Sequence, residues 1–164
     1  YDPTPAFSYG LNIYLEYKNF DLTMFWQGVQ GVDVISDLKK ETDLWSGLNI
    51  GFLNKGKRVL DAWSPTNPDS DIPALSRDDI NNEKRVSTFF VENGSYLKLR
   101  NLQIGYNVPQ NLVKKIKMER LRFYLSAQNL LTIKSKDFTG VDPENPNFGY
   151  PIPLNVTFGV NVSF

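Results

Sequence analysis

The segment 154–164 alternates strictly between apolar side chains and small or polar ones. A period of two places successive side chains on opposite faces of a β-strand. The apolar face carries Leu154, Val156, Phe158, Val160, Val162 and Phe164, and the other face carries Asn155, Thr157, Gly159, Asn161 and Ser163. A transmembrane barrel strand needs about 9–11 residues, with apolar side chains toward lipid and polar ones toward the lumen. The pattern therefore predicts a membrane-spanning strand. The chain also ends here on an aromatic residue, whereas a water-soluble terminus is usually polar.

Earlier parts of the chain repeat this alternation. The predicted strands are 7–17, 20–28, 95–108, 121–132 and 154–164. The first two are separated only by Lys18-Asn19, and Asn accepts the positive φ of tight hairpins. In 95–108 the alternation changes phase near Arg100-Asn101, and a β-bulge of one extra residue would restore it. We therefore expect an antiparallel all-β sheet.

Two long connections, 29–94 and 134–153, lack sustained alternation. Ser36 is expected to cap a short helix that runs to Trp45, and a helical turn is expected over 57–63. Connections of this length are unusual in a compact soluble domain but common on the outer rim of a membrane barrel. If the carboxyl end lies on the periplasmic side, both long connections are extracellular and both short ones are periplasmic.

Composition excludes several classes of function. The chain of 164 residues has no Cys and no His, and its 18 basic residues balance 18 acidic ones. It therefore lacks thiolate ligands, the usual general base, and the charge excess that nucleic-acid binding requires. No strand places two carboxylates on one polar face, as glycoside hydrolysis would need. We predict no enzyme activity, cofactor, metal site or nucleic-acid partner.

Several motifs resemble those of one family. The segment 93–106, NGSYLKLRNLQIGY, is similar to the GSYLKLRNLQLGY segment of SusC/RagA-type TonB-linked outer-membrane transporters. The segments AQNLLTI at 127–133 and GVDPE at 140–144 resemble two further motifs of that family. The segment 150–164 resembles the family's YPIPRTYTFGLNVTF ending. The motifs occur in the family's order and cover most of the chain.

This resemblance implies a 22-stranded barrel in the bacterial outer membrane, of which this chain supplies the last five strands. It also implies an amino-terminal plug coupled to the TonB complex, a SusD-like lipoprotein lid, and an oligosaccharide or peptide substrate. The rest of the barrel, the plug and membrane lipid would then be partners. The terminal strand resembles the signal that the barrel-assembly machinery reads, formed by Phe158, Val160, Val162 and Phe164.

Candidate contact residues follow from these faces. Arg122, Tyr124 and Gln128 share the polar face of 121–132, so they are expected to contact the plug, the wall or the substrate, with plug or wall contact favoured. Trp45, Trp63 and Tyr150 lie in the long connections and are candidates for stacking on sugars. For the two Trp residues, packing of the loop or its partner is the preferred interpretation.

A soluble β-sandwich that binds carbohydrate is the alternative from the same residues. It requires the apolar faces of the five strands to meet each other and Phe164 to be buried. A membrane wall instead leaves those faces open to lipid.

Overall fold

The computed structural model describes residues 1–44, 54–76, 78, 82, 85–147 and 149–164. The chain divides into two compact units. The sheet unit comprises Pro5–Gly31, Ser95–Lys134 and Ile152–Phe164, and the loop unit comprises Tyr1–Thr4, Val32–Gly94 and Ser135–Pro151. In the described part of the chain, none of the helices has the length and apolar character needed to cross a bilayer.

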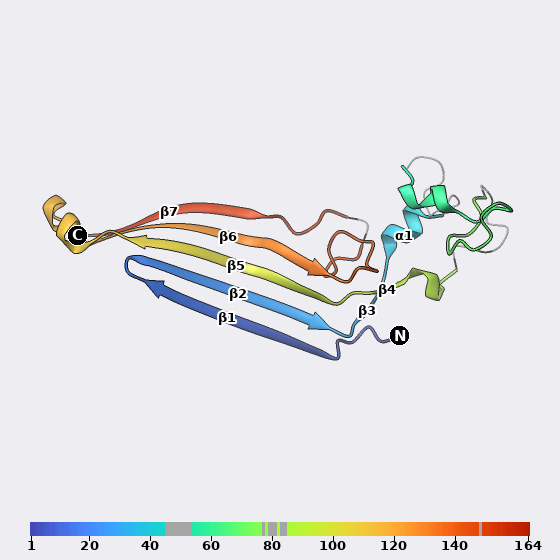
Figure 1. The fold of residues 1–164 in the computed structure, drawn as a ribbon, viewed down its shortest axis with the longest axis horizontal. Coiled ribbons are helices and arrows are strands. Elements are labelled where there is room, and N and C mark those ends of the chain that lie inside the picture. Colours follow the sequence, from blue (N-terminus) through green and yellow to red (C-terminus); the bar gives the residue numbers. More distant parts are fainter. Residues whose placement is uncertain (45–53, 77, 79–81, 83–84, 148) are drawn as a thin grey trace. The chain divides into compact units, whose positions relative to one another are not determined.

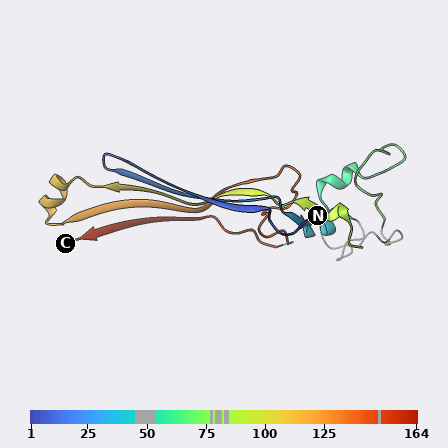
Figure 2. The ribbon, with the colours of Figure 1, turned by 90° about the horizontal axis from the view of Figure 1, so that it is seen from below.

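The sheet unit is one antiparallel sheet of five long strands (Figure 1). Its strands are β1 (Phe7–Tyr17), β2 (Phe20–Gln30), β5 (Tyr96–Asn107), β6 (Arg120–Lys134) and β7 (Asn155–Ser163). They lie in the order β1-β2-β5-β6-β7, so each long strand pairs with the next one along the chain. β1 and β7 are consequently the two edges. Figure 2 shows these strands from another side as one twisted layer.

The long strands lie close to the ranges expected from alternation. β2 continues to Gln30 and β6 to Lys134, each two residues beyond its expected end. The hairpin between β1 and β2 has the expected two-residue connection, but its left-handed residue is Lys18, with φ of 55°, and not Asn19. The shorter β5–β6 connection contains α2 (Gln110–Val113) and the 3-10 helix η3 (Lys114–Ile116).

The predicted β-bulge is confirmed. Asn101 pairs with Phe25, but Leu99 pairs with Trp26, so Arg100 is one extra residue in β5. The register between β5 and β6 shifts at the same place. There Asn129 of β6 adopts a φ of 55°. The bulge keeps Leu97 and Leu99 on the same face as the apolar residues that follow, which explains the change of phase in the sequence.

The loop unit is built from short elements. These are β3 (Asp33–Ile35), β4 (Val91–Asn93), α1 (Asp37–Thr42), and the 3-10 helices η1 (Lys57–Asp61) and η2 (Thr88–Phe90). β3 and β4 form an antiparallel pair that was not expected, because three residues are too few to show alternation. The buried apolar side chains of the loop unit include Leu44, Ile72, Phe90 and Phe138.

Ser36 caps α1 as predicted, since its Oγ accepts a hydrogen bond from the Lys39 backbone N at 3.3 Å. The helix ends at Thr42, before the expected end at Trp45, which lies outside the described residues. The helical turn expected over 57–63 ends at Asp61.

Candidate functional site: the two faces of the sheet

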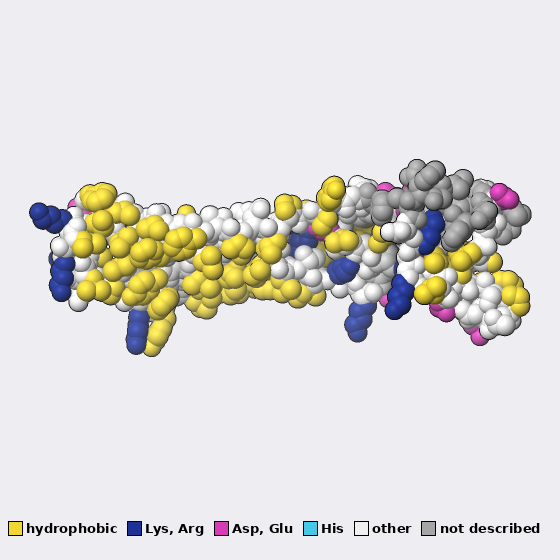
Figure 3. All heavy atoms as spheres, turned by 90° about the horizontal axis from the view of Figure 1, so that it is seen from above, with side chains coloured by type: hydrophobic (Ala, Val, Ile, Leu, Met, Phe, Trp, Pro, Cys, Tyr) yellow, Lys and Arg dark blue, Asp and Glu magenta, His cyan; other side chains and the backbone are white. Residues whose placement is uncertain are grey.

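Strand register places the alternating apolar side chains of the five strands on one face of the sheet, whereas Phe25 of β2 lies on the other. One pairing row crosses all five strands, and it consists of Leu15, Leu22, Ile104, Leu125 and Phe158. Along the edge strand β7, Val156, Phe158 and Val160 are 62%, 67% and 45% exposed. Hydrophobic side chains form a continuous band over the strands (Figure 3). A soluble protein rarely leaves a contiguous apolar surface of this extent uncovered, so the face requires an apolar environment.

Aromatic side chains concentrate toward both ends of this apolar face. Near the short connections, a pairing row contains Tyr17, Phe20, Tyr106 and Phe123. The Phe20 and Tyr106 ring centroids are 4.8 Å apart. Toward the other end, Tyr9 and Trp26 occupy the same face. This arrangement matches the two interfacial girdles of a membrane barrel. The alignment of the aromatic row across four strands depends on the pairing register.

The separation of the two aromatic groups fits a bilayer. Tyr17 and Tyr9 are eight residues apart on β1. At roughly 3.4 Å per residue they are about 27 Å apart along the strand, and a tilt of about 35–45° reduces this to about 20 Å across the membrane. The apolar band of an outer-membrane barrel is about 25 Å tall. The length of the apolar face is therefore appropriate for a membrane-spanning wall.

The opposite face is polar and contains an ion pair that links strands two apart. Arg122 of β6 donates from Nε to Asp21 Oδ2 at 3.1 Å and from Nη2 to Asp21 Oδ1 at 2.5 Å. Asn107 Nδ2 also donates to Asp21 Oδ2, at 3.1 Å. Both charged side chains are largely buried, with 12% of Arg122 and 9% of Asp21 exposed. Asp21 was not a candidate residue, because its partner lies about a hundred positions away in the chain.

Gly105 allows Arg122 of β6 to contact Asp21 of β2 across the strand between them. It pairs with Asp21 on one side and with Tyr124 on the other, so it lies on β5 between the two charged strands. An ideal Cβ on Gly105 would stand 2.4 Å from Arg122 Nη2 and 2.5 Å from either Asp21 carboxylate oxygen. Because Gly105 has no side chain, the guanidinium of Arg122 can lie across the middle strand.

Tyr124 also lies over a glycine of a neighbouring strand. Its ring lies over Gly159 of β7, where an ideal Cβ would be 2.2 Å from Tyr124 Cζ. The Arg122 guanidinium carbon is 5.6 Å from the centre of the Tyr124 ring, within cation–π range. Of the three residues expected to face a lumen, Arg122 and Tyr124 therefore contact the wall itself, and Gln128 is exposed. Contact of any of them with a plug or substrate stays a prediction.

Of the three aromatic candidates in the long connections, the structure describes Trp63 and Tyr150. Trp63 is 45% exposed and Tyr150 is 95% exposed. Trp45 lies outside the described residues. A sugar-stacking role for the three aromatics stays a prediction.

The sandwich alternative required two layers of this chain to enclose the apolar face. The described strands form one five-stranded sheet and a two-stranded ribbon of three-residue strands. The ribbon is too small to cover five strands of nine to fifteen residues. No sandwich is therefore present in the described part of the chain.

Known proteins resemble this chain over almost its whole length, although no family model matches it. TonB-dependent receptor P3 of Formosa agariphila is 37% identical over 179 residues, covering 99% of this chain and 17% of the relative. TonB-dependent receptor P26 of the same organism is 33% identical over 177 residues, with the same coverages. The chain thus spans 17% of the length of these curated relatives.

Solved structures show the same similarity. The RagAB peptide importer in its closed-closed state matches with a TM-score of 0.79 and 30% identity, over 98% of this chain and 17% of that chain. Its open-open state matches with a TM-score of 0.76 and 30% identity, with the same coverages.

Proposed function

Because this chain belongs to the SusC/RagA family of TonB-dependent receptors, we propose that it is the carboxy-terminal part of the barrel wall of an outer-membrane importer. The observation that carries the proposal is the uncovered apolar face, which crosses all five strands and has aromatic residues toward both ends. In a bilayer, lipid tails cover this face. The unpaired edges of β1 and β7 continue into the remaining wall, because an open edge cannot persist in lipid.

The polar face lines the lumen. There the Asp21–Arg122 ion pair joins β2 to β6 across β5, and the packing of Tyr124 on Gly159 braces β6 against its neighbour β7. Gln128 and the other exposed polar side chains of this face contact the plug, which transmits the energy that TonB supplies. The chain itself performs no covalent chemistry.

The long connections 29–94 and 134–153 form part of the extracellular rim and receive a SusD-like lipoprotein. The similar RagAB is named as a peptide importer. For this chain we propose an imported glycan or peptide, as for the family. Phe158, Val160, Val162 and Phe164 serve as the signal for barrel assembly in this proposal.

A pair of substitutions on β7 tests which face meets lipid. Val156 lies near the middle of the apolar face, outside the proposed assembly signal, and Thr157 is the next residue, on the polar face. In the full-length receptor, Val156→Arg is expected to reduce insertion, because Arg near the bilayer centre costs about 2–4 kcal/mol on the lipid side of a barrel. Thr157→Arg is expected to insert normally.

The readout is the fraction of receptor in the outer membrane that keeps the mobility of a folded barrel on an unheated gel. Equal insertion of the two variants, or a larger loss with Thr157→Arg, would overturn the assignment of the faces. The two variants add the same side chain at adjacent positions, so their net charge is the same.

A further inference from the structure

Both short connections of the sheet unit carry a lysine at a left-handed backbone position. Lys18 in the β1–β2 turn has a φ of 55°, and Lys117 in the β5–β6 connection has a φ of 56°. Glycine adopts this conformation at a lower energetic cost, because a Cβ is crowded there. Strained backbone of this kind concentrates at functional positions. Local backbone preference therefore does not explain the lysine at either position.

The two connections lie at the same end of the sheet (Figure 1). The backbone N of Asn107, where β5 ends, donates to the backbone O of Asn19 in the β1–β2 turn at 2.8 Å. Lys and Arg side chains are visible at this end of the hydrophobic band (Figure 3). Lys18 and the connection 108–120 therefore belong to one surface, called the basic rim below, which continues from the apolar face.

The basic rim has an excess of positive charge. The connection 108–120 contains four basic residues and one acidic residue, which are Lys114, Lys115, Lys117, Arg120 and Glu119. All five are exposed. With respect to the described residues, the side chains of Lys114, Lys115 and Lys117 form no hydrogen bond or ion pair. Their ammonium groups are thus available to an anionic partner outside the described chain.

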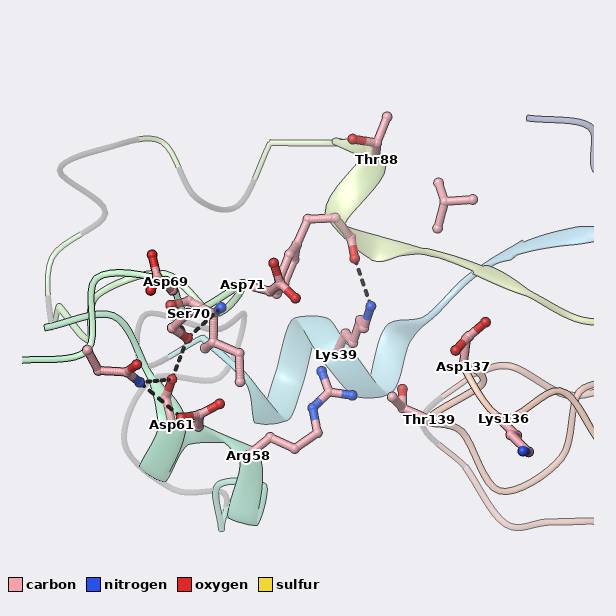
Figure 4. Close-up of a pocket in the computed structure, with 14 residues that line it drawn as sticks. Lys39, Arg58, Asp61, Asp69, Ser70, Asp71, Thr88, Lys136, Asp137 and Thr139 are labelled. Atoms are coloured by element: carbon pink, nitrogen blue, oxygen red, sulfur yellow. Dashed lines mark hydrogen bonds between the residues drawn. The ribbon is translucent and has the colours of Figure 1, made fainter.

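A cleft in the loop unit shows a different balance of charge (Figure 4). Its described lining contains three basic residues and four acidic ones. Lys39 of this lining forms an ion pair with the buried Glu92 at 3.2 Å, and Lys136 is followed directly by Asp137. The positive excess of the basic rim is therefore not a general feature of the chain, and it calls for a local explanation.

Two apolar side chains are exposed in the same connection. Leu112 and Ile116 are 49% and 53% exposed. They are four residues apart in the helical turn formed by α2 and η3, so they share one side of it. Val113, in contrast, is fully buried. Exposed apolar side chains beside lysines are typical of a segment that lies at a membrane surface.

The basic rim lies at the depth of lipid headgroups. The aromatic row that contains Phe123 marks the edge of the apolar face. Arg120, where β6 begins, is about 10 Å from Phe123 along the strand, or about 8 Å across a membrane at a tilt of about 40°. The headgroup region on each side of the hydrocarbon core is about 5–8 Å thick.

Lysine side chains of the rim can return to this region because their stems are long. Lys18 shows this directly, since its Nζ is 5.2 Å from the centre of the Tyr17 ring in the aromatic row. The ammonium groups and the exposed apolar side chains thus lie where lipid phosphates and the first acyl carbons would be.

We propose that the basic rim binds the headgroup phosphates of anionic phospholipids. Lys114, Lys115 and Lys117 pair with the phosphates, while Leu112 and Ile116 insert among the acyl chains. The membrane is the partner because its charge is complementary and because the rim is continuous with the lipid-facing side of the sheet. This inference rests on the proposed function, which places the five strands in a bilayer.

The test is lipid binding to the purified full-length receptor in detergent, measured by native mass spectrometry. The probes are equimolar dioleoyl-phosphatidylglycerol and dioleoyl-phosphatidylcholine, which have identical acyl chains and differ in headgroup charge. A lysine near an anionic membrane surface contributes up to about fivefold in affinity. Phosphatidylglycerol is therefore expected to bind at least about fivefold more than phosphatidylcholine. Equal binding of the two lipids, or no binding of phosphatidylglycerol, would overturn the proposal.

Two double variants with the same change of net charge assign the preference to the rim. Lys114→Gln/Lys115→Gln is expected to lower phosphatidylglycerol binding about fivefold or more and to leave phosphatidylcholine binding unchanged. Lys57→Gln/Lys136→Gln removes two exposed lysines of the loop unit and is expected to keep the full preference. If the two double variants behave alike, the preference does not come from the basic rim and the proposal is wrong.

Lys117→Gly separates charge from turn stability. It removes an ammonium group and also relieves the left-handed backbone, so the turn should be at least as stable as before. Phosphatidylglycerol binding is nevertheless expected to fall about threefold. Lys117→Arg keeps the charge and should keep the binding. Unchanged binding in Lys117→Gly, or an equal loss in Lys117→Arg, would contradict a role for this charge.

Leu112→Ser/Ile116→Ser tests contact with the acyl chains. This double variant is expected to lower the binding of both lipids and to leave their ratio unchanged, because the two lipids have the same chains. Unchanged binding of both lipids would show that the turn does not insert and would refute the docking of the rim on the membrane.

Failure of this inference is distinguishable from failure of the proposed function. Equal insertion of Val156→Arg and Thr157→Arg would count against the proposed function, whatever the lipid preference. A receptor that folds and inserts normally but binds both lipids equally would count against the basic rim alone.

Discussion

Gly105→Ala should break the ion pair that crosses the middle of the sheet. The new Cβ would stand 2.4 Å from Arg122 Nη2 and 2.5 Å from both Asp21 oxygens. These separations are far below van der Waals contact. Because the crowded atoms belong to side chains, we expect the guanidinium and carboxylate to move apart while the strands keep their pairing.

The expected loss of stability in Gly105→Ala follows from the two hydrogen bonds that join Arg122 to Asp21. Hydrogen bonds to charged groups contribute about 1.5–3 kcal/mol, and the low exposure of this pair leaves little screening by solvent. Removing one partner outright would cost more, about 3–5 kcal/mol, because the other charge would remain unpaired. In Gly105→Ala both charges remain and can reach water in the lumen, so we expect about 1.5–3 kcal/mol of local stability to be lost.

Hydrogen exchange of the full-length receptor measures this loss locally. Backbone amides near Asp21, Gly105 and Arg122 should exchange about 10–150-fold faster, if they exchange through local opening. Gly149→Ala is the matched control, because an ideal Cβ on Gly149 has no atom within 4 Å. If Gly105→Ala exchanges no faster than Gly149→Ala, the ion pair does not brace the wall and the reasoning is wrong.

Three further predictions use the same receptor. Gly159→Ala should destabilise the barrel by about 1–3 kcal/mol, because its Cβ would overlap the Tyr124 ring. This loss of stability should largely disappear when Tyr124→Ala is added. Persistence of the loss in thermal unfolding of the double variant would contradict this explanation. Ser36→Ala should cost about 1 kcal/mol through loss of the cap on α1, seen as faster exchange in α1, and unchanged exchange there would exclude a capping role. Asn129→Val should be less stable than Asn129→Gly by about 1–2 kcal/mol because φ is 55°, and equal melting temperatures would show that the bulge relaxes.

Much of the sheet was predictable because alternation is a local property. The apolar residues of each strand identify its faces without knowledge of its neighbours. The bulge was predictable for the same reason, since Arg100 interrupts an otherwise regular period. β3 and β4 were not, because strands of three residues carry no period to recognise.

The side-chain networks were not predictable. Asp21 and Arg122 lie on strands that do not pair with each other, and their contact depends on Gly105 between them. Glu92 similarly joins Lys39 and Thr139, which are far from it in the chain. No short-range pattern marks such residues, because the pairing register decides which side chains meet. The positive φ of the hairpin was expected from Asn19 by residue preference, but it occurs at Lys18.

The sequence alone was enough to recognise this chain's strands, its lipid-compatible face and its family resemblance. Hydrophobic alternation and short motifs can be read from a single segment, without knowledge of its partner strand. Tertiary structure decided the rest: which rows of aromatic residues align, which charges are paired across a glycine, and which loop residues surround the cleft. The physical reason is that a strand's period is a property of its own residues, whereas register and long-range contacts depend on every strand of the sheet at once.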